Sequence, residues 1–162
     1  MAAASEVPGP LAVPASHDTA LRVLPAGHRC GQGTHSTVAD GRRVCWTPTT
    51  PARVAVDAEL AAGPVPPALA ARWGSADPDV VWPRWCWVEC VAKLTDTPVL
   101  LLARTRPEPG HPDRPVRLGT GPTAARMRWR PDRVADLVLV RAVLEAPDRR
   151  GSALPDPGPS PR

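Results

Sequence analysis

Four charged side chains, on two short segments, have the types and spacing to do chemistry together. Asp57 and Glu59 are two residues apart in a segment that alternates as a strand does, so both carboxylates lie on one face. Glu89 and Lys93 are one helical turn apart and share a helix face. Converging carboxylates repel one another unless a cation lies among them, and their oxygen atoms suit Mg²⁺, which leaves room for water and substrate phosphate. A lysine beside a metal-bound phosphate would assist a phosphoryl-type transfer.

Lys93 is the only lysine in a chain of 162 residues. Phe, Tyr, Ile and Asn are absent, and they share A/T-rich codons with Lys, which indicates a GC-rich genome that converts Lys to Arg wherever charge alone matters. A lysine that is retained is therefore a candidate for chemistry. The alternative is a Glu89–Lys93 pair on a helix surface, which stabilises a helix by roughly 0.3–0.5 kcal/mol, and the spacing alone favours that interpretation.

The composition predicts one basic domain. The formal net charge is +4 and the hydrophobic content is 43%, with Trp as the only aromatic residue. This charge is compatible with a phosphate-bearing ligand or an acidic protein partner, whereas nucleic acid is less supported because the arginines form no single run. The N-terminal segment lacks the features of a signal peptide, and no apolar run approaches a membrane span. We therefore expect a cytoplasmic protein that makes no contact with a membrane.

The cysteines predict neither a disulfide nor a zinc site. Cys30, Cys45, Cys86 and Cys90 show no C-x-x-C spacing, and the last two are one helical turn apart. A metal site built from His28, Cys30, His35 and Cys45 matches no familiar spacing. Buried free thiols are the expectation.

Turn signals and period-two alternation predict an α+β domain over residues 18–146, between Pro-rich disordered tails at 1–17 and 147–162. The expected helices are Pro67–Trp73, with Gly74 as its stop, and a central helix from Pro83 to about Leu94. The expected strands are Leu21–Leu24, Thr34–Val38, Arg43–Thr47, Arg53–Glu59, Pro98–Arg104, Pro115–Leu118, Ala125–Arg130 and Leu137–Leu144. The second and third of these strands form a hairpin around Asp40-Gly41.

Trp129 lies among three arginines, Arg126, Arg128 and Arg130, and could stack on a nucleic-acid base. The same alternation is typical of a half-buried strand with Met127 and Trp129 inward, and we favour the strand.

The two charged segments resemble the paired signatures of the 4′-phosphopantetheinyl transferases. Those signatures are approximately [VI]-G-[VI]-D-[VI]-E and W-x-x-K-E-[AS]-x-x-K, in that order. Here residues 54–59 read Val-Ala-Val-Asp-Ala-Glu, and residues 85–93 read Trp-Cys-Trp-Val-Glu-Cys-Val-Ala-Lys. Upstream, Thr34-His35-Ser36 resembles the Ser-His-Ser segment of the surfactin-synthetase type. The resemblance covers roughly residues 30–146, and after Pro98 only the spacing of the expected strands matches. It implies a transferase-like lobe in which a mostly antiparallel sheet packs on a central helix.

The resemblance implies Mg²⁺-dependent transfer of 4′-phosphopantetheine from coenzyme A to a serine of an acyl or peptidyl carrier protein. Asp57, Glu59 and Glu89 would hold Mg²⁺ on the pyrophosphate of coenzyme A. Glu89, or a water held by the ion, would take the proton of the serine hydroxyl, and Lys93 would assist the leaving group. His35, with the neighbouring Thr34, would contact the 3′-phosphate of coenzyme A.

The sequence departs from the family pattern by the small changes Ala55 for Gly and Cys90 for Ala or Ser, and by three larger ones. Val88 stands where the family has the first lysine of Lys-Glu, so one phosphate contact is missing. The interval from Glu59 to Glu89 is short, which would trim the segment that contacts the carrier. Only about forty ordered residues precede Asp57, so the first of the two lobes is truncated. Either a second subunit completes the cleft or coenzyme A binding is impaired.

Three other interpretations stay open. The chain could be a catalytically impaired relic of this family that binds carrier protein or coenzyme A. It could be a small basic protein that binds nucleic acid. It could also be an accidental reading frame of GC-rich DNA, although the ordered motifs and alternating strands oppose this.

Overall fold

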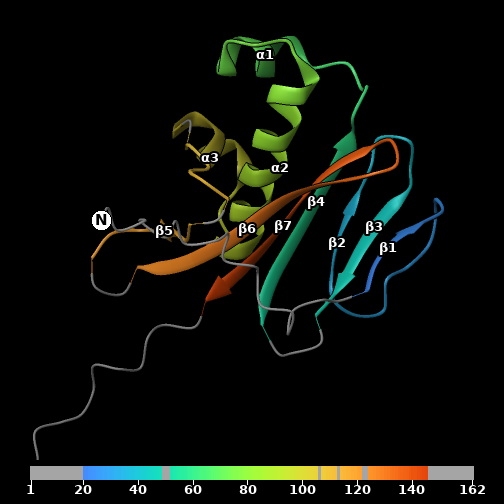
Figure 1. Ribbon diagram of the computed structural model, residues 1–162, viewed down its shortest axis with the longest axis horizontal. Coiled ribbons are helices and arrows are strands. Elements are labelled where there is room, and N and C mark those ends of the chain that lie inside the picture. Colours follow the sequence, from blue (N-terminus) through green and yellow to red (C-terminus); the bar gives the residue numbers. More distant parts are fainter. Residues whose placement is uncertain (1–19, 49–51, 106, 113, 122–123, 146–162) are drawn as a thin grey trace, which may run out of the picture.

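Two antiparallel sheets and three helices make up the part of the chain that the computed structural model describes, residues 20–48, 52–105, 107–112, 114–121 and 124–145 (Figure 1). This confirms the α+β class. The tails expected at 1–17 and 147–162 lie outside the described residues. Within the described ranges, no helix has both the length and the apolar character needed to cross a membrane.

The larger sheet has the strand order β4-β7-β6-β5. Its strands are β4 (Arg53–Leu60), β5 (Val116–Leu118), β6 (Ala125–Val134) and β7 (Leu137–Glu145). All three of its strand pairs are antiparallel, so β4, which comes first in the chain, pairs with β7, which comes last. This order leaves β4 at one edge of the sheet.

The smaller sheet has the order β1-β3-β2, from β1 (Ala20–Leu24), β2 (Thr34–Thr37) and β3 (Arg43–Thr47). Its inner face carries Val44 and Trp46, which are 0% and 2% exposed and share a core with Val56 and Leu139 of the larger sheet. The edge strand β2 therefore comes to lie beside the edge strand β4, although the two are not joined by a ladder of backbone hydrogen bonds.

Helix α2 (Pro78–Thr95) packs on β4 and β7 from the other side. It begins five residues before the expected start at Pro83, because Asp77 caps it by accepting a hydrogen bond from the Asp79 amide, and Pro78 fits the first turn. Pro83 lies inside this helix, near its start, between the buried Trp82 and Cys86.

The strand β4 is buried on both sides because it runs between α2 and β2 (Figure 1). Val56 and Ala58 pack toward the smaller sheet, whereas Ala55 packs in the core under α2. The predicted alternation is thus confirmed: Asp57 and Glu59 share the face of Ala55, which is the face that meets α2.

The expected buried strand at Pro98–Arg104 is wrong, because this segment forms helix α3 (Val99–Thr105). Pro98 starts the helix by accepting hydrogen bonds from the Leu101 and Leu102 amides. A short apolar run does not distinguish a strand from a helix, and this helix leaves Leu100 71% exposed. The other short helix, α1 (Pro67–Trp73), is as predicted and stops at Gly74 in the left-handed region, with φ 66°.

The remaining strand predictions hold, and β6 and β7 run beyond the expected ends. Met127 and Trp129 point inward, with exposures of 0% and 7%, which confirms the half-buried strand and removes Trp129 as a stacking platform.

The expectation that all four cysteines are free thiols is wrong for two of them. Cys30 and Cys45 form a disulfide, with Cα atoms 6.4 Å apart, because the segment before β2 folds back over the outer face of β3. This contact joins a loop to a strand, and no local spacing motif predicts it. Cys86 and Cys90 are buried free thiols, as predicted. Disulfides are typical of oxidising compartments, so this pair and the expectation of a cytoplasmic protein point in different directions.

The turn between β6 and β7 gives a first test of the fold. It has two residues, and the first, Ala135, lies in the left-handed region with φ 52°, where glycine is preferred. Ala135→Gly should therefore raise the free energy of unfolding by about 1 kcal/mol, measured by chemical denaturation. The control is Ala71→Gly in α1, where the same change at a helical φ should lower stability by about 0.5–1 kcal/mol. Equal destabilisation by both variants would contradict the left-handed conformation of Ala135 in this turn.

Candidate functional site

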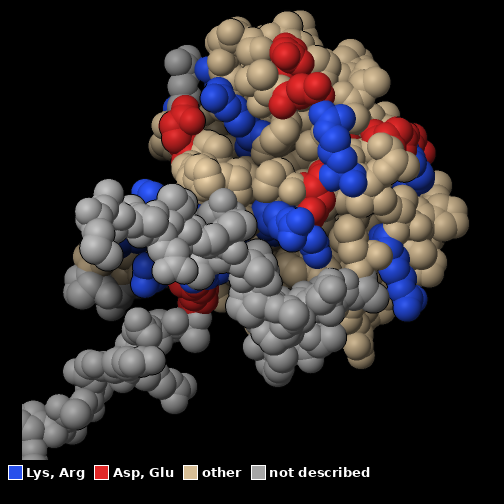
Figure 2. All heavy atoms as spheres, in the orientation of Figure 1, with Lys and Arg blue, Asp and Glu red and all other residues tan. Residues whose placement is uncertain are grey.

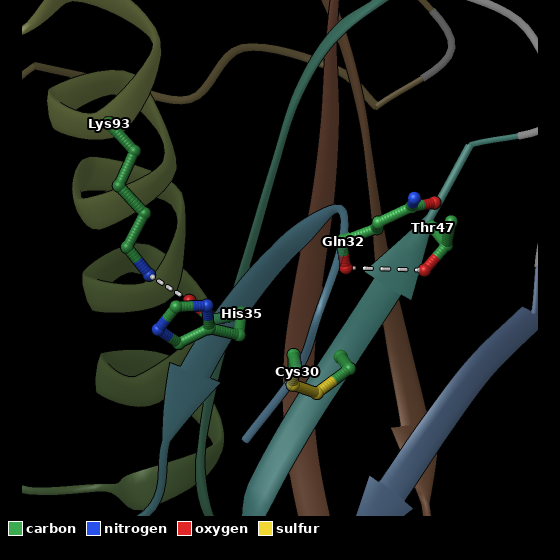
Figure 3. The surroundings of a disulfide bond; sticks show 6 residues. Cys30, Gln32, His35, Thr47 and Lys93 are labelled. Carbon is green, nitrogen blue, oxygen red and sulfur yellow. Dashed lines mark hydrogen bonds between the residues drawn. A yellow bond between two sulfur atoms is a disulfide. The ribbon is translucent and has the colours of Figure 1, made fainter.

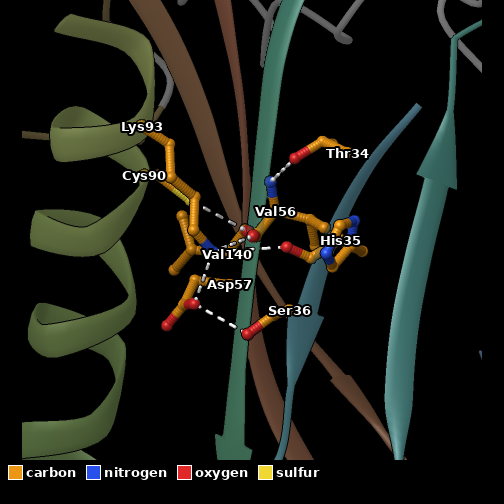
Figure 4. A network of polar contacts seen from close by, with 8 residues as sticks. All are labelled: Thr34, His35, Ser36, Val56, Asp57, Cys90, Lys93 and Val140. Carbon is orange, nitrogen blue, oxygen red and sulfur yellow. Dashed lines mark hydrogen bonds and ion pairs between the residues drawn. The ribbon is translucent and has the colours of Figure 1, made fainter. Parts of the chain in front are cut away.

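Asp57 lies at the centre of the candidate site, buried between β2 and α2. Only 5% of its surface is exposed. Its Oδ1 atom accepts a hydrogen bond from the Ser36 hydroxyl and one from the Lys93 ammonium, each 2.8 Å long (Figure 4). A buried carboxylate is tolerated when it is paired and hydrogen-bonded in this way.

The Lys93 ammonium links α2 to the edges of both sheets. It donates to the backbone carbonyl of Val56 on β4 at 2.8 Å and, more weakly, to that of His35 on β2 at 3.5 Å. With Asp57, these acceptors account for the three donors of an ammonium group. Burial lowers the pKa of Lys93, but Asp57, Cys90 and Glu89 together outweigh burial and raise it above the usual value, so the ammonium stays charged.

The expected surface pair between Glu89 and Lys93 is not what the structure shows. Lys93 of α2 forms its ion pair with Asp57 of the neighbouring strand β4, and not with Glu89 of the same helix. The carboxylate of Glu89 instead lies half-buried on the α2 face that meets β4.

Glu59 and Glu89 complete a group of three carboxylates between β4 and α2. Burial, followed by repulsion from Asp57 and then from Glu89, raises the pKa of Glu59 from 4.5 to about 7, against an opposing hydrogen bond from Trp85. Burial and Asp57 likewise raise the pKa of Glu89, and Lys93 opposes the shift. The three acidic residues predicted to act together are thus close enough to repel one another.

The segment Thr34-His35-Ser36 is divided between the two faces of β2. Thr34 and Ser36 point toward β4, where the Thr34 hydroxyl accepts from the Val56 amide at 3.4 Å. His35 pairs with Cys45 in the register, so its imidazole lies on the outer face, and only its carbonyl contacts Lys93. Burial, Arg43 and Lys93 lower the pKa of His35, which keeps the imidazole neutral at pH 7.

The buried side chains of α2, which pack in the core next to the carboxylates, are all apolar groups or thiols. Cys86 and Cys90 are fully buried against β4 and β7, and burial raises the pKa of both thiols well above the usual range. Cys90 donates to the Val140 carbonyl at 3.4 Å. Val88, at the position where the transferase family has a lysine, is also fully buried in this core. These thiols are structural, because a protonated, buried sulfur is inert.

In the described ranges, no three His, Cys, Asp or Glu side chains are arranged to hold a metal ion. Asp57 Oδ1 is already engaged by Ser36 and Lys93. Glu59 and Glu89 remain, and their chemistry fits Mg²⁺, which often takes one or two protein carboxylates and completes its shell with water and substrate phosphate. Glu59 and Glu89 are therefore the two carboxylates of this group that are not hydrogen-bonded to Lys93.

Comparisons with protein-family models, with curated proteins and with solved structures each found no match to this chain.

Ser36 and the two backbone carbonyls are the part of the site that sequence reasoning missed. Ser36 belongs to the Thr-His-Ser segment, and the alternation of β2 could have indicated that it and His35 point in opposite directions. The carbonyls of His35 and Val56 carry no sequence signal, because any residue has one.

The raised pKa of Glu59 predicts a pH dependence of stability. The folded chain holds the Glu59 proton between pH 4.5 and about 7, where the unfolded chain loses it, so the free energy of unfolding falls as the pH rises through this window. Glu59→Gln keeps an acceptor for Trp85 and should raise stability at pH 8 by about 1–2 kcal/mol, allowing for partial exposure, with little effect at pH 4.5.

The measurement is chemical denaturation at pH 4.5, 6 and 8. Glu108→Gln, which removes an exposed carboxylate, is the control and should change stability equally at all three values. Glu89 also has a raised pKa, so a smaller pH dependence should remain in Glu59→Gln, and a pH dependence as large as that of the original chain would contradict the assignment.

Proposed function

We propose that this chain transfers the 4′-phosphopantetheine group from coenzyme A to a serine of an acyl or peptidyl carrier protein, with Mg²⁺ as its metal. One observation carries the proposal. Glu59 and Glu89 lie half-buried beside Asp57 and Lys93, and burial, followed by repulsion from Asp57, raises the pKa of both carboxyl groups against the opposing charge of Lys93. Such a site would gain from a divalent cation that brings a pyrophosphate.

Glu59 and Glu89 would hold the ion, with Asp57 behind them. A bound Mg²⁺ would neutralise the pyrophosphate of coenzyme A. Asp57, fixed by Ser36 and Lys93, would keep β4 and α2 at the separation that the two glutamates need.

Glu89 would act as the general base. Its raised pKa brings it nearer to neutral pH, where a carboxylate is a more effective base. It would take the proton of the carrier serine, the serine oxygen would form a bond to the β-phosphorus, and the bond from that phosphorus to the leaving phosphate would break. Adenosine 3′,5′-bisphosphate would leave, and Lys93, which stays charged, would give up one of its three acceptors to stabilise it.

In this proposal Thr34 and His35 both contact coenzyme A, but they do so from different faces of β2. Thr34 lies on the β2 face near the site, whereas the imidazole of His35 is on the outer face and would reach only a part of the cofactor that passes over the edge of β2. A second copy of the chain completing the cleft remains part of the proposal.

The second candidate is a relic of the same family that binds coenzyme A or carrier protein without turnover. Val88 favours it, because a fully buried position cannot present a charge to phosphate. The engagement of all three Lys93 donors within the chain also favours it.

The test is to mix the purified chain with coenzyme A, Mg²⁺ and several apo carrier proteins, and to weigh the carriers by mass spectrometry. The proposal expects a phosphopantetheine mass gain. Glu89→Gln should slow the transfer by about 10²–10⁴-fold, the usual contribution of a general base.

Glu108→Gln, an exposed carboxylate outside the site, is the matched control and should transfer at the original rate. Measurable binding of coenzyme A without any mass gain would select the relic. A gain that Glu89→Gln leaves unchanged would show that the catalytic group is elsewhere.

A further inference from the structure

The positive charge of the described chain is concentrated in one segment. Residues 20–48 hold four arginines and one aspartate, a formal net charge of +3, against +2 for all the other described residues together. Elsewhere, Arg53 and the arginines of β6 and β7 each pair with a carboxylate. Figure 2 shows basic and acidic side chains side by side on one face of the molecule. On the smaller sheet, Arg42 pairs with Asp40 and Asp136, whereas Arg22 and Arg43 form no such pair among the described residues.

These basic groups lie on the outer face of the smaller sheet. The register pairs Cys45 of β3 with Arg22 on one side and His35 on the other, so the three side chains stand in a row. Arg43 follows on the same face, two residues along β3. Among the described residues, neither Arg22 nor Arg43 forms an ion pair with a carboxylate.

This face is hollowed beside the disulfide. The hollow has a volume of about 390 Å³, at the small end of the range for ligand sites. Arg22, His28, Gln32 and Thr47 give it polar walls, while Leu24 and Pro48 give it an apolar one. Figure 3 shows how Cys30 fixes its loop over the sheet, and Gln32 is held there by a hydrogen bond from Thr47 to its carbonyl.

We propose that this hollow binds an organic phosphate, a phosphate group attached to a small apolar or sugar-like body. Arg22 would hold two phosphate oxygens with its planar guanidinium, and His28 and the Gln32 amide would donate to the same group. The body would lie on Leu24 and Pro48. The disulfide keeps the loop that carries His28 and Gln32 in place before the ligand arrives.

The site is separate from the carboxylate cluster. Ser36 and Thr34 reach that cluster from the inner face of β2, whereas Arg22 projects from the opposite face of the same sheet. The proposal therefore does not depend on transferase activity, and Glu89→Gln should leave binding in the hollow unchanged.

The experiment is an NMR titration of the ¹⁵N-labelled full chain with phenyl phosphate, using benzyl alcohol and inorganic phosphate as comparison probes. Phenyl phosphate should give saturable shifts confined to residues 21–32 and 44–48, tighter than inorganic phosphate, and benzyl alcohol should give none. Arg22→Gln should weaken binding by about tenfold or more, and His28→Gln should weaken it less.

The matched control is Arg104→Gln, which removes an exposed arginine in α3 and should change the affinity less than twofold. Both arginines are on the surface, so the unliganded spectra should show that each variant is folded. Equal weakening by Arg22→Gln and Arg104→Gln, shifts spread over the chain without saturation, or equal affinity for phenyl and inorganic phosphate would overturn the proposal.

Discussion

The fold depends on one ammonium group placed where two sheets meet without a backbone ladder. The edges β2 and β4 lie beside each other, and the polar contacts described across the seam come from side chains: Thr34 to β4, Ser36 to Asp57, and Lys93 from α2 to both edges. Asp57 is buried at this seam and needs a cation, because an unpaired carboxylate in such a place costs several kcal/mol. The lysine therefore joins the smaller sheet, β4 and α2 at this seam, beside the apolar core that Val44 and Trp46 share with Val56 and Leu139.

This geometry gives a physical reason for the single lysine. A compact ammonium directs three donors toward three acceptors around one point, which the planar guanidinium of arginine cannot do. Lys93 meets that requirement with Asp57 and the carbonyls of Val56 and His35. This structural requirement alone explains why a lysine is retained at position 93 despite the codon bias. A role of Lys93 in chemistry would be a second reason. The same pairing occupies Asp57 and leaves Glu59 and Glu89 as the carboxylates of the group that Lys93 does not bind.

Much of the fold could be predicted from the sequence, since the alternation in β4 correctly placed Asp57 and Glu59 toward α2, and Gly74 correctly ended α1. The failures have two causes: local patterns that fit more than one structure, and contacts between segments distant in the sequence. Residues 99–105 form a helix that an apolar run does not distinguish from a strand, and Cys30 meets Cys45 only when a loop folds over β3. Of the site, spacing identified the acidic residues and Lys93, but not that Lys93 would be bound to Asp57, because that depends on where β2 docks.

The most direct test of the role of Lys93 is a double-mutant cycle on Asp57 and Lys93. The free energies of unfolding of Asp57→Asn, Lys93→Met and the double variant would be compared with that of the original chain by chemical denaturation at pH 7. The account predicts that the second substitution costs much less once the first is present, with an interaction energy of about 1–3 kcal/mol. Additive effects, within about 0.5 kcal/mol, would contradict it.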